Sequence, residues 1–90
     1  LPKSHLITLM AILKVQNKRK KQYIELKEIR TYALELADEH KMKKFEFEDY
    51  MNDLLDRKII EMKSLKEIGM NITSLAELEP LLEQQIKEQD

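Results

Sequence analysis

Apolar residues recur at helical spacing from the start of the chain, where Ser4 is placed to cap a first helix. The positions at i, i+3, i+4 and i+7 of its stripe are Leu6, Leu9, Met10 and Leu13. Ile7, Ile12 and Val15 widen this stripe, so we expect this helix to be the central one. The polar run at 16–22 contains no apolar residue and predicts a loop or a frayed helix end.

The same spacing predicts two more helices in the middle of the chain. One extends from Leu26 to the region of His40, and the other ends at Arg57 and Lys58. The stripe of the earlier helix consists of Leu26, Ile29, Ala33 and Leu36. The apolar face of the later helix consists of Phe47, Tyr50, Met51, Leu54 and Leu55. We expect a single core cluster where these stripes meet, made of Leu9, Leu13, Ile29, Leu36, Phe47, Met51, Leu54 and Ile60.

Three segments have the short length and residue types of strands. Residues 23–26 alternate weakly between polar and apolar, and they lead directly into the second helix. Residues 59–63 and 70–73 are rich in β-branched and long apolar side chains. Gly69, the only glycine, lies between these two segments, where a hairpin turn needs a positive φ. The pattern therefore predicts a β-hairpin between 59–63 and 70–73.

A last helix follows the hairpin and begins at a capping box formed by Ser74 and Glu77. Its apolar positions are Leu75, Leu78, Leu82 and Ile86. Pro80 is expected to kink this helix or to restart it. The order helix, short strand, helix, helix, strand, wing, strand, helix is that of a winged helix, mostly α with a small β-hairpin. The competing interpretation, a bundle of helices with 59–73 as an irregular connection, needs a structureless loop that is uncommon in so small a domain.

Composition limits the class of protein. The chain has 90 residues, 37% charged, with no cysteine, so it has no disulfide framework and no thiolate metal site. It contains no run approaching the ~20 apolar residues of a membrane span, and no signal-peptide pattern. We expect one intracellular domain, nuclear if the source is eukaryotic and otherwise cytoplasmic. The start at Leu1 rather than methionine indicates a piece of a longer protein.

Charge is divided unevenly along the sequence. Residues 1–27 contain seven basic side chains and one acid, whereas residues 28–90 contain nine basic side chains and sixteen acids. Such asymmetry is typical of a basic patch that meets a polyanion. A solvated loop beside ordinary acidic helix faces explains the same numbers without any partner.

Three stretches carry a resemblance to a known family: residues 1–13 before the polar gap, the helix start at 24–29, and the join at 54–60. Together they resemble the C-terminal winged-helix domain of the Orc1/Cdc6 family of AAA+ replication initiators, which includes origin recognition complex subunits such as Orc4. The resemblance covers most of the chain. It implies a domain that follows the ATPase domains of an origin-bound helicase loader and touches DNA through the third helix and the wing. The family often has a glycine where this chain has Lys58, and often has basic residues on the third helix.

The third helix departs from that pattern because its outer positions are mostly acidic. These positions are Glu46, Glu48, Asp49, Asn52, Asp53 and Asp56. A helix in the major groove lies among phosphates spaced at one charge per ~1.7 Å of duplex, so these acids would repel DNA. Contact with duplex DNA is therefore expected to be weak, directed at phosphates and low in sequence preference. The residues expected to make it are Lys18, Arg19, Lys20, Lys21, Lys41, Lys43, Lys44, Lys63 and Lys66.

The alternative function is a winged helix used only for protein docking in a nuclear or cytosolic complex. In it, the acidic third helix or the acidic last helix meets a basic partner. The docking residues would be Glu48, Asp49, Asn52, Asp53 and Asp56. The expected partners are duplex DNA and other subunits of a replication complex, with no membrane and no small molecule.

No motif in the chain points to catalysis or to a cofactor. His5 and His40 have no spacing to acids or to each other that matches a metal site, and we expect both on the surface. One glycine cannot form a phosphate-binding loop, so an ATPase site would lie outside this fragment. The glycosylation sequon at 71–73 is expected to be a chance match, since no secretory signal accompanies it. The chain is accordingly expected to be neither an enzyme nor a metal or cofactor binder.

Overall fold

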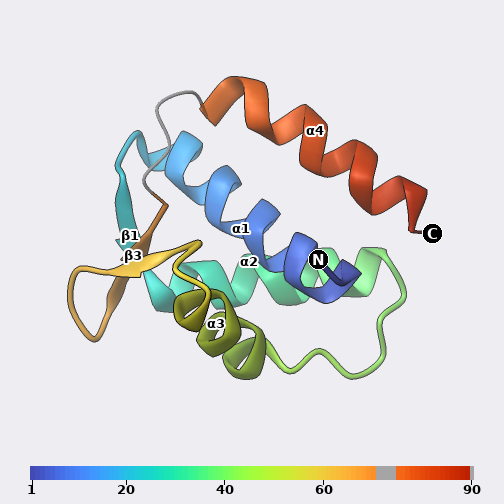
Figure 1. The fold of residues 1–90 in the computed structure, drawn as a ribbon, viewed down its shortest axis with the longest axis horizontal. Helices are drawn as coiled ribbons and strands as arrows, with labels where there is room; N and C mark the ends of the chain where they lie inside the picture. Colours follow the sequence, from blue (N-terminus) through green and yellow to red (C-terminus); the bar gives the residue numbers. More distant parts are fainter. Residues whose placement is uncertain (71–74, 90) are drawn as a thin grey trace.

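The computed structural model describes the backbone of residues 1–70 and 75–89, and the side chains of residues 1–70 and 79–89. Its elements in chain order are α1 (Lys3–Arg19), β1 (Tyr23–Glu25), α2 (Leu26–Glu39), α3 (Phe47–Asp56), β2 (Glu61–Met62), β3 (Glu67–Gly69) and α4 (Leu75–Glu88). In Figure 1, α1 lies between α4 on one side and α2 and α3 on the other, with the small sheet at one end. This arrangement confirms the predicted winged helix, and its strands at 61–62 and 67–69 pair where the competing interpretation expected an irregular connection.

The first helix is central, as predicted, and is buried on all sides from His5 to Leu13. It begins at Lys3 behind Pro2, so Ser4 lies within the first turn and does not cap it. It also continues through part of the polar run, which is not a loop until after Arg19. The reason is tertiary: Gln16 is fully buried, and its Nε2 donates hydrogen bonds to the carbonyl oxygens of Gln22 (2.5 Å) and Met70 (3.5 Å).

The sheet has the strand order β1-β3-β2, and both pairings are antiparallel. Ile24 pairs with Ile68, and both side chains face the core, with 3% and 1% exposure. The second strand of the predicted hairpin was misplaced: β3 is Glu67–Gly69 and precedes the predicted 70–73, of which 71–73 lie outside the described part of the chain. The first strand, β2, is Glu61–Met62 and is shorter than the predicted 59–63. Residues 63–66 form the wing loop, closed by a hydrogen bond from the Lys63 N–H to the Glu67 oxygen (3.0 Å).

Gly69 is needed for close packing and not for a turn, which corrects the predicted positive φ. It lies in β3 opposite Tyr23, and a Cβ at this position would lie 2.1 Å from the carbonyl oxygen of Gln22. Only a residue without a side chain lets β3 approach the segment that leads into β1 so closely.

The core forms one cluster around α1, as predicted. Of the eight residues expected there, Leu36 is half-buried at the edge of the cluster and the other seven are buried. Leu82 and Ile86 of α4 close the cluster from the opposite side, with 7% and 3% exposure.

The last helix is continuous through Pro80, so the predicted restart does not occur. Besides its apolar contacts, α4 is held to α1 by Lys14, whose Nζ lies 2.8 Å from Glu79 Oε1 and 3.5 Å from Glu83 Oε1. The hydrogen bond to Glu79 raises the pKa of Lys14. The proposed capping box at Ser74 and Glu77 lies outside the side chains that the structure describes.

Each of the three helices α1, α2 and α3 is followed by a lysine in the left-handed region: Lys20, Lys41 and Lys58, with φ of 56°, 59° and 60°. After α3, the N–H groups of Lys58 and Ile59 donate to the oxygens of Leu55 and Leu54, the hydrogen-bond pattern of a Schellman motif. A left-handed residue directly after a helix is the position where glycine is most common. A lysine here also places a cation beside the negative end of the helix dipole.

Candidate nucleic-acid and protein-docking surfaces

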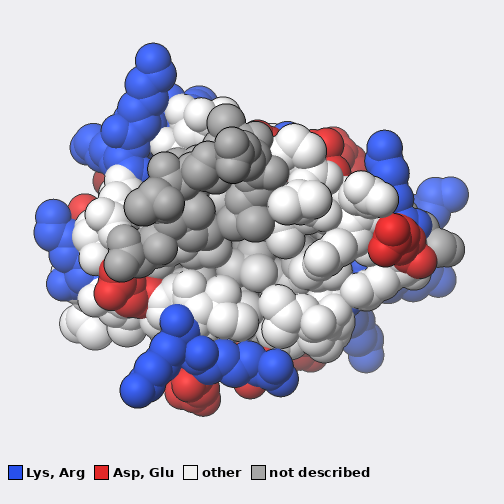
Figure 2. Space-filling model, turned by 45° about the horizontal axis from the view of Figure 1, so that its top comes forward, with Lys and Arg blue, Asp and Glu red and all other residues white. Residues whose placement is uncertain are grey.

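The cationic side chains predicted to contact DNA do not form one surface. Lys41, Lys43 and Lys44 follow the C-terminal end of α2, whereas β1 and the wing lie at its N-terminal end. A 14-residue helix is about 21 Å long, so these lysines are far from the wing. Figure 2 likewise shows Lys and Arg side chains at separate places around the rim of one face.

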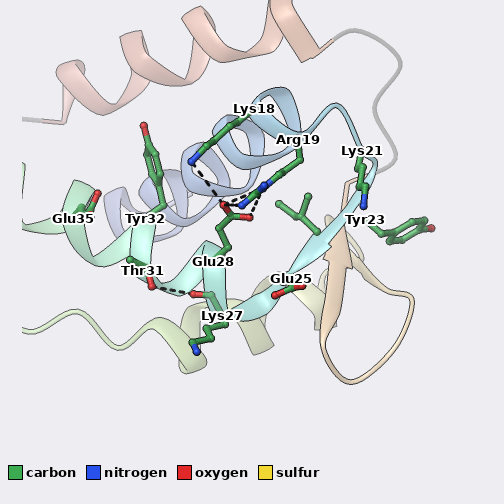
Figure 3. A pocket seen from close by; sticks show the side chains of 11 residues that line it. Lys18, Arg19, Lys21, Tyr23, Glu25, Lys27, Glu28, Thr31, Tyr32 and Glu35 are labelled. Carbon is green, nitrogen blue, oxygen red and sulfur yellow. Dashed lines mark hydrogen bonds and ion pairs between the residues drawn. The ribbon is translucent and has the colours of Figure 1, made fainter.

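Two of the nine predicted cations are already paired within the chain. Arg19 donates to both carboxylate oxygens of Glu28, with distances of 2.8 to 3.2 Å, and the Lys18 Nζ lies 3.9 Å from the same carboxylate. Figure 3 shows Glu28 pointing toward these two side chains at one side of a groove of about 600 Å³. The hydrogen bond from Arg19 lowers the pKa of Glu28, which keeps the pair ionised. Lys18 and Arg19 therefore offer less positive charge to a ligand than their number suggests.

The cations that the fold does bring together flank strand β1. Lys21 precedes this strand, and the Lys63 Nζ from the wing lies 5.6 Å from the centre of the Tyr23 ring. At the other end of β1, the Leu26 N–H donates to the Lys66 oxygen (2.8 Å), which ties the wing loop to the start of α2. We call the five exposed lysines of this region the wing edge: Lys20, Lys21, Lys27, Lys63 and Lys66.

Lys27 and Arg30 were not among the predicted contacts, although the fold places both beside the wing. They line a groove of about 650 Å³ between α2 and the wing loop, together with Lys66. The only signal in the sequence was their i, i+3 spacing at the start of a helix, which is common on solvated faces. What makes them neighbours of Lys66 is the backbone hydrogen bond between the two elements.

Acidic side chains lie between the lysines of the wing edge and reduce its positive electrostatic potential. Glu25 and Glu67 stand directly opposite each other in the ladder between β1 and β3. Like charges in such a pair repel one another. Glu61 accepts a hydrogen bond from the Tyr23 hydroxyl (2.8 Å). A polyanion at this edge would meet a weakly positive surface.

The outer face of α3 is acidic, as the sequence predicted. Its exposed residues are Glu48, Asp49, Asn52 and Asp56. Glu48 forms an ion pair with Arg30 of α2. Asp49 and Asp56 have no ion pair among the residues that the structure describes, so their charges are directed to solvent.

Asp53, which was grouped with these docking residues, also contacts two side chains of this chain. Its Oδ2 lies 2.6 Å from His5 Nε2 and 3.0 Å from Arg57 Nε. His5 is 8% exposed, which corrects its predicted place on the surface, and its Nδ1 lies 3.1 Å from the Ser4 hydroxyl oxygen. The Nε2 donor to Asp53 and the Nδ1 contact with Ser4 use both nitrogens of the ring. His40, the second histidine, is half-buried at the end of α2. The contact from His5 to Asp53 joins α1 to α3 and was invisible in the sequence because the two residues are far apart along it.

This contact predicts how stability depends on acid pH. The hydrogen bond from His5, aided by Arg57, lowers the pKa of Asp53 below its ordinary 3.8. A carboxyl with a lower pKa in the folded chain stabilises the fold above its unfolded-state pKa, and the stabilisation disappears as pH falls through the folded-state value. The difference in unfolding free energy between wild type and Asp53→Asn should thus be present at about pH 5 and shrink as the pH falls below about 4.

Urea denaturation at a series of pH values measures this difference. Asp56→Asn is the matched control, since it removes the same charge from an exposed site on the same helix. A difference for Asp53→Asn that stays constant down to the lowest pH would show that the contact with His5 does not stabilise the fold.

Within the described residues, no group of three or more His, Asp or Glu side chains is arranged to hold a metal ion. The helices of the described chain are also too short or too polar to cross a membrane.

Comparison with known proteins identifies the fold. No protein-family model matches the chain, and no curated protein sequence matches it. A solved structure that is similar is the crystal structure of Cdc6p from Pyrobaculum aerophilum, with a TM-score of 0.84 and 22% sequence identity. The match covers 99% of this chain and 24% of the Cdc6p chain. The chain therefore has a winged-helix fold that closely resembles part of Cdc6p, and it spans about a quarter of that protein's length.

Proposed function

We propose that this chain is a winged-helix domain of a DNA replication initiator and that it contacts duplex DNA through phosphates. The observation that carries the proposal is the match to Cdc6p, which extends over 99% of the chain at a TM-score of 0.84. The resemblance of three sequence stretches to the Orc1/Cdc6 family points to the same conclusion. Its finer form, a subunit such as Orc4 acting in origin recognition, remains a prediction.

The wing edge is the best candidate for the DNA contact. Its lysines are exposed and lie before β1, at the start of α2 and in the wing loop. The Leu26 to Lys66 hydrogen bond holds the wing loop to the start of α2. The outer face of α3 is a poor candidate because the carboxylates of Asp49 and Asp56, which have no ion pair within the described part of the chain, would face phosphates. Recognition of bases by α3 in the major groove is therefore not proposed, and the wing edge would supply weak, sequence-tolerant binding.

A titration of labelled duplex at low salt tests this proposal. We expect wild type to bind weakly, with affinity falling by a log–log slope of about −0.9 for each phosphate neutralised. The double variant Lys63→Glu with Lys66→Glu should abolish binding. The matched control, Lys41→Glu with Lys43→Glu, makes the same charge change at the far end of α2 and should weaken binding much less.

Charge reversal on α3 is expected to change the affinity for duplex in the opposite direction. Asp49→Lys with Asp56→Lys should strengthen duplex binding, because it removes repulsion without disturbing the contact between His5 and Asp53. If wild type fails to bind at ~50 mM salt, direct DNA contact by this domain is wrong. If the two lysine-to-glutamate double variants, at 63 and 66 and at 41 and 43, weaken binding equally, the wing edge is not the site.

A second function is favoured by one specific observation. The carboxylates of Asp49 and Asp56 are exposed on α3 and have no ion pair among the described residues. Charges that neither stabilise the fold nor suit a polyanion are available for a basic protein partner. We therefore propose that α3 docks a neighbouring subunit, a role that is compatible with DNA contact at the wing edge.

A further inference from the structure

An apolar patch lies where α3 passes into the wing. Ile59 and Met62 are 36% and 46% exposed, and Leu55 beside them is half-buried. These three side chains line a hollow of about 500 Å³ between the end of α3 and β2. Leu34, Leu65 and Leu81 are as exposed as Ile59 or more exposed, so what distinguishes this group is that its side chains are contiguous around one hollow.

The backbone explains why this patch is on the surface. The turn after α3 places Lys58 in the left-handed region and sends Ile60 into the core, where it is 3% exposed. Ile59 is consequently left outside. Met62 lies on β2, which is an edge strand because the strand order is β1-β3-β2. The outer side of β2 is unpaired in the described chain, so no element of that part covers Met62.

The charges next to the patch are mainly negative on the side of α3. Asp49, Asn52 and Asp56 lie along one ridge of the helix, at i, i+3 and i+7, and Asp56 adjoins Leu55. Glu61 lines the hollow from β2. Among the nearby cations, Arg57 is engaged by Asp53, and Lys58 lines the hollow together with Glu61.

We propose that the hollow between α3 and β2 docks a basic segment of a partner protein that carries apolar side chains. The apolar side chains cover Leu55, Ile59 and Met62, while Lys or Arg residues of the segment lie against Asp49 and Asp56. The proposal rests on the docking function assigned to α3 and adds the site and the chemistry of the partner. A nucleic acid does not fit, because phosphates gain nothing from the apolar patch and are repelled by the ridge.

A peptide titration followed by amide NMR tests the proposal on the ¹⁵N-labelled chain. The probe is a synthetic peptide that alternates leucine with lysine, and the comparison peptide replaces each leucine by serine. We expect the leucine peptide to shift amides of residues 49–62 and to bind at least tenfold more tightly than the serine peptide. If the peptide instead shifted the amide resonances of the groove lined by Glu35, Glu39 and Ile86, the assignment would be overturned.

Two variants separate the charged and apolar contributions. Asp49→Lys with Asp56→Lys, and Ile59→Ser with Met62→Ser, should each weaken the leucine peptide at least tenfold. The control, Leu34→Ser with Glu39→Lys, changes exposed residues of α2 and should leave binding unchanged. Thermal melting of each variant shows whether it is folded. Unchanged binding in the folded Ile59→Ser with Met62→Ser variant would show that the apolar patch is not the site.

Duplex DNA provides the remaining comparison. The Ile59→Ser with Met62→Ser variant should bind duplex as wild type does, since the wing-edge lysines are intact. If duplex shifts the amides of residues 49–62 and the peptide does not, this surface belongs to nucleic acid and the proposal is wrong. Loss of duplex binding alone would contradict the wing-edge contact and leave peptide docking supported, so the two proposals fail separately.

Discussion

Replacing Leu54 by alanine is expected to lower the free energy of unfolding by about 2–5 kcal/mol. Leu54 is fully buried in the cluster around α1. Its removal takes apolar surface out of the core and leaves a cavity that the packed helices fill only in part. A domain of this size has on the order of 5–10 kcal/mol of stability, so the variant should be close to unfolding at ordinary temperature.

Urea denaturation followed by far-ultraviolet circular dichroism measures the loss. Leu34→Ala is the matched control, because Leu34 is also a helical leucine but is 45% exposed. Its effect should remain within about 0.5 kcal/mol of wild type. Equal destabilisation by the two substitutions would mean that the core does not centre on the face of α3 that carries Leu54.

Replacing Gly69 by alanine is expected to destabilise the fold by about 1–3 kcal/mol or more. The added Cβ would lie 2.1 Å from the Gln22 carbonyl oxygen, so β3 must move away from the chain that enters β1. Alanine also restricts the unfolded chain, which by itself would stabilise the protein by about 0.4–1 kcal/mol. The sign of the measured change therefore decides between the two effects.

A double-mutant cycle locates the obstruction. The ideal Cβ would also lie 3.1 Å from a ring carbon of Tyr23, a contact that Tyr23→Ala removes. Since the closer contact is with backbone, Tyr23→Ala should not restore the stability of Gly69→Ala. Restoration by Tyr23→Ala would show that the aromatic ring, and not the Gln22 carbonyl, excludes a side chain here.

The periodic apolar stripes predicted α1, α2 and α3 and almost the whole core. Helical spacing depends on residues three and four apart, so the information lies within each segment. The buried face of α3, with Phe47, Met51 and Leu54, follows from that spacing alone. The acidic outer face of α3 follows from the same argument, because the positions that do not face the core are exposed.

The sheet was predicted less well because its strands are two or three residues long. Such strands have too few positions to show an alternation, and their bounds depend on which residues pair. Pairing of Ile24 with Ile68 puts both side chains into the core and places Gly69 against Gln22. A glycine at a turn and a glycine at a close approach look the same in the sequence, so the wing was misplaced by a few residues.

The chain alone thus determines the helices, the winged-helix order and the charge of each helix face, since these depend on neighbouring residues. Tertiary structure decided which distant residues meet: His5 with Asp53, Gln16 with Met70, and Lys66 with the start of α2. It also divided the predicted cations, pairing Arg19 with Glu28 and leaving Lys41 at the far end of α2. Charge adds along a sequence, but a ligand responds only to charges that the fold brings within a few ångströms of one another and leaves unpaired.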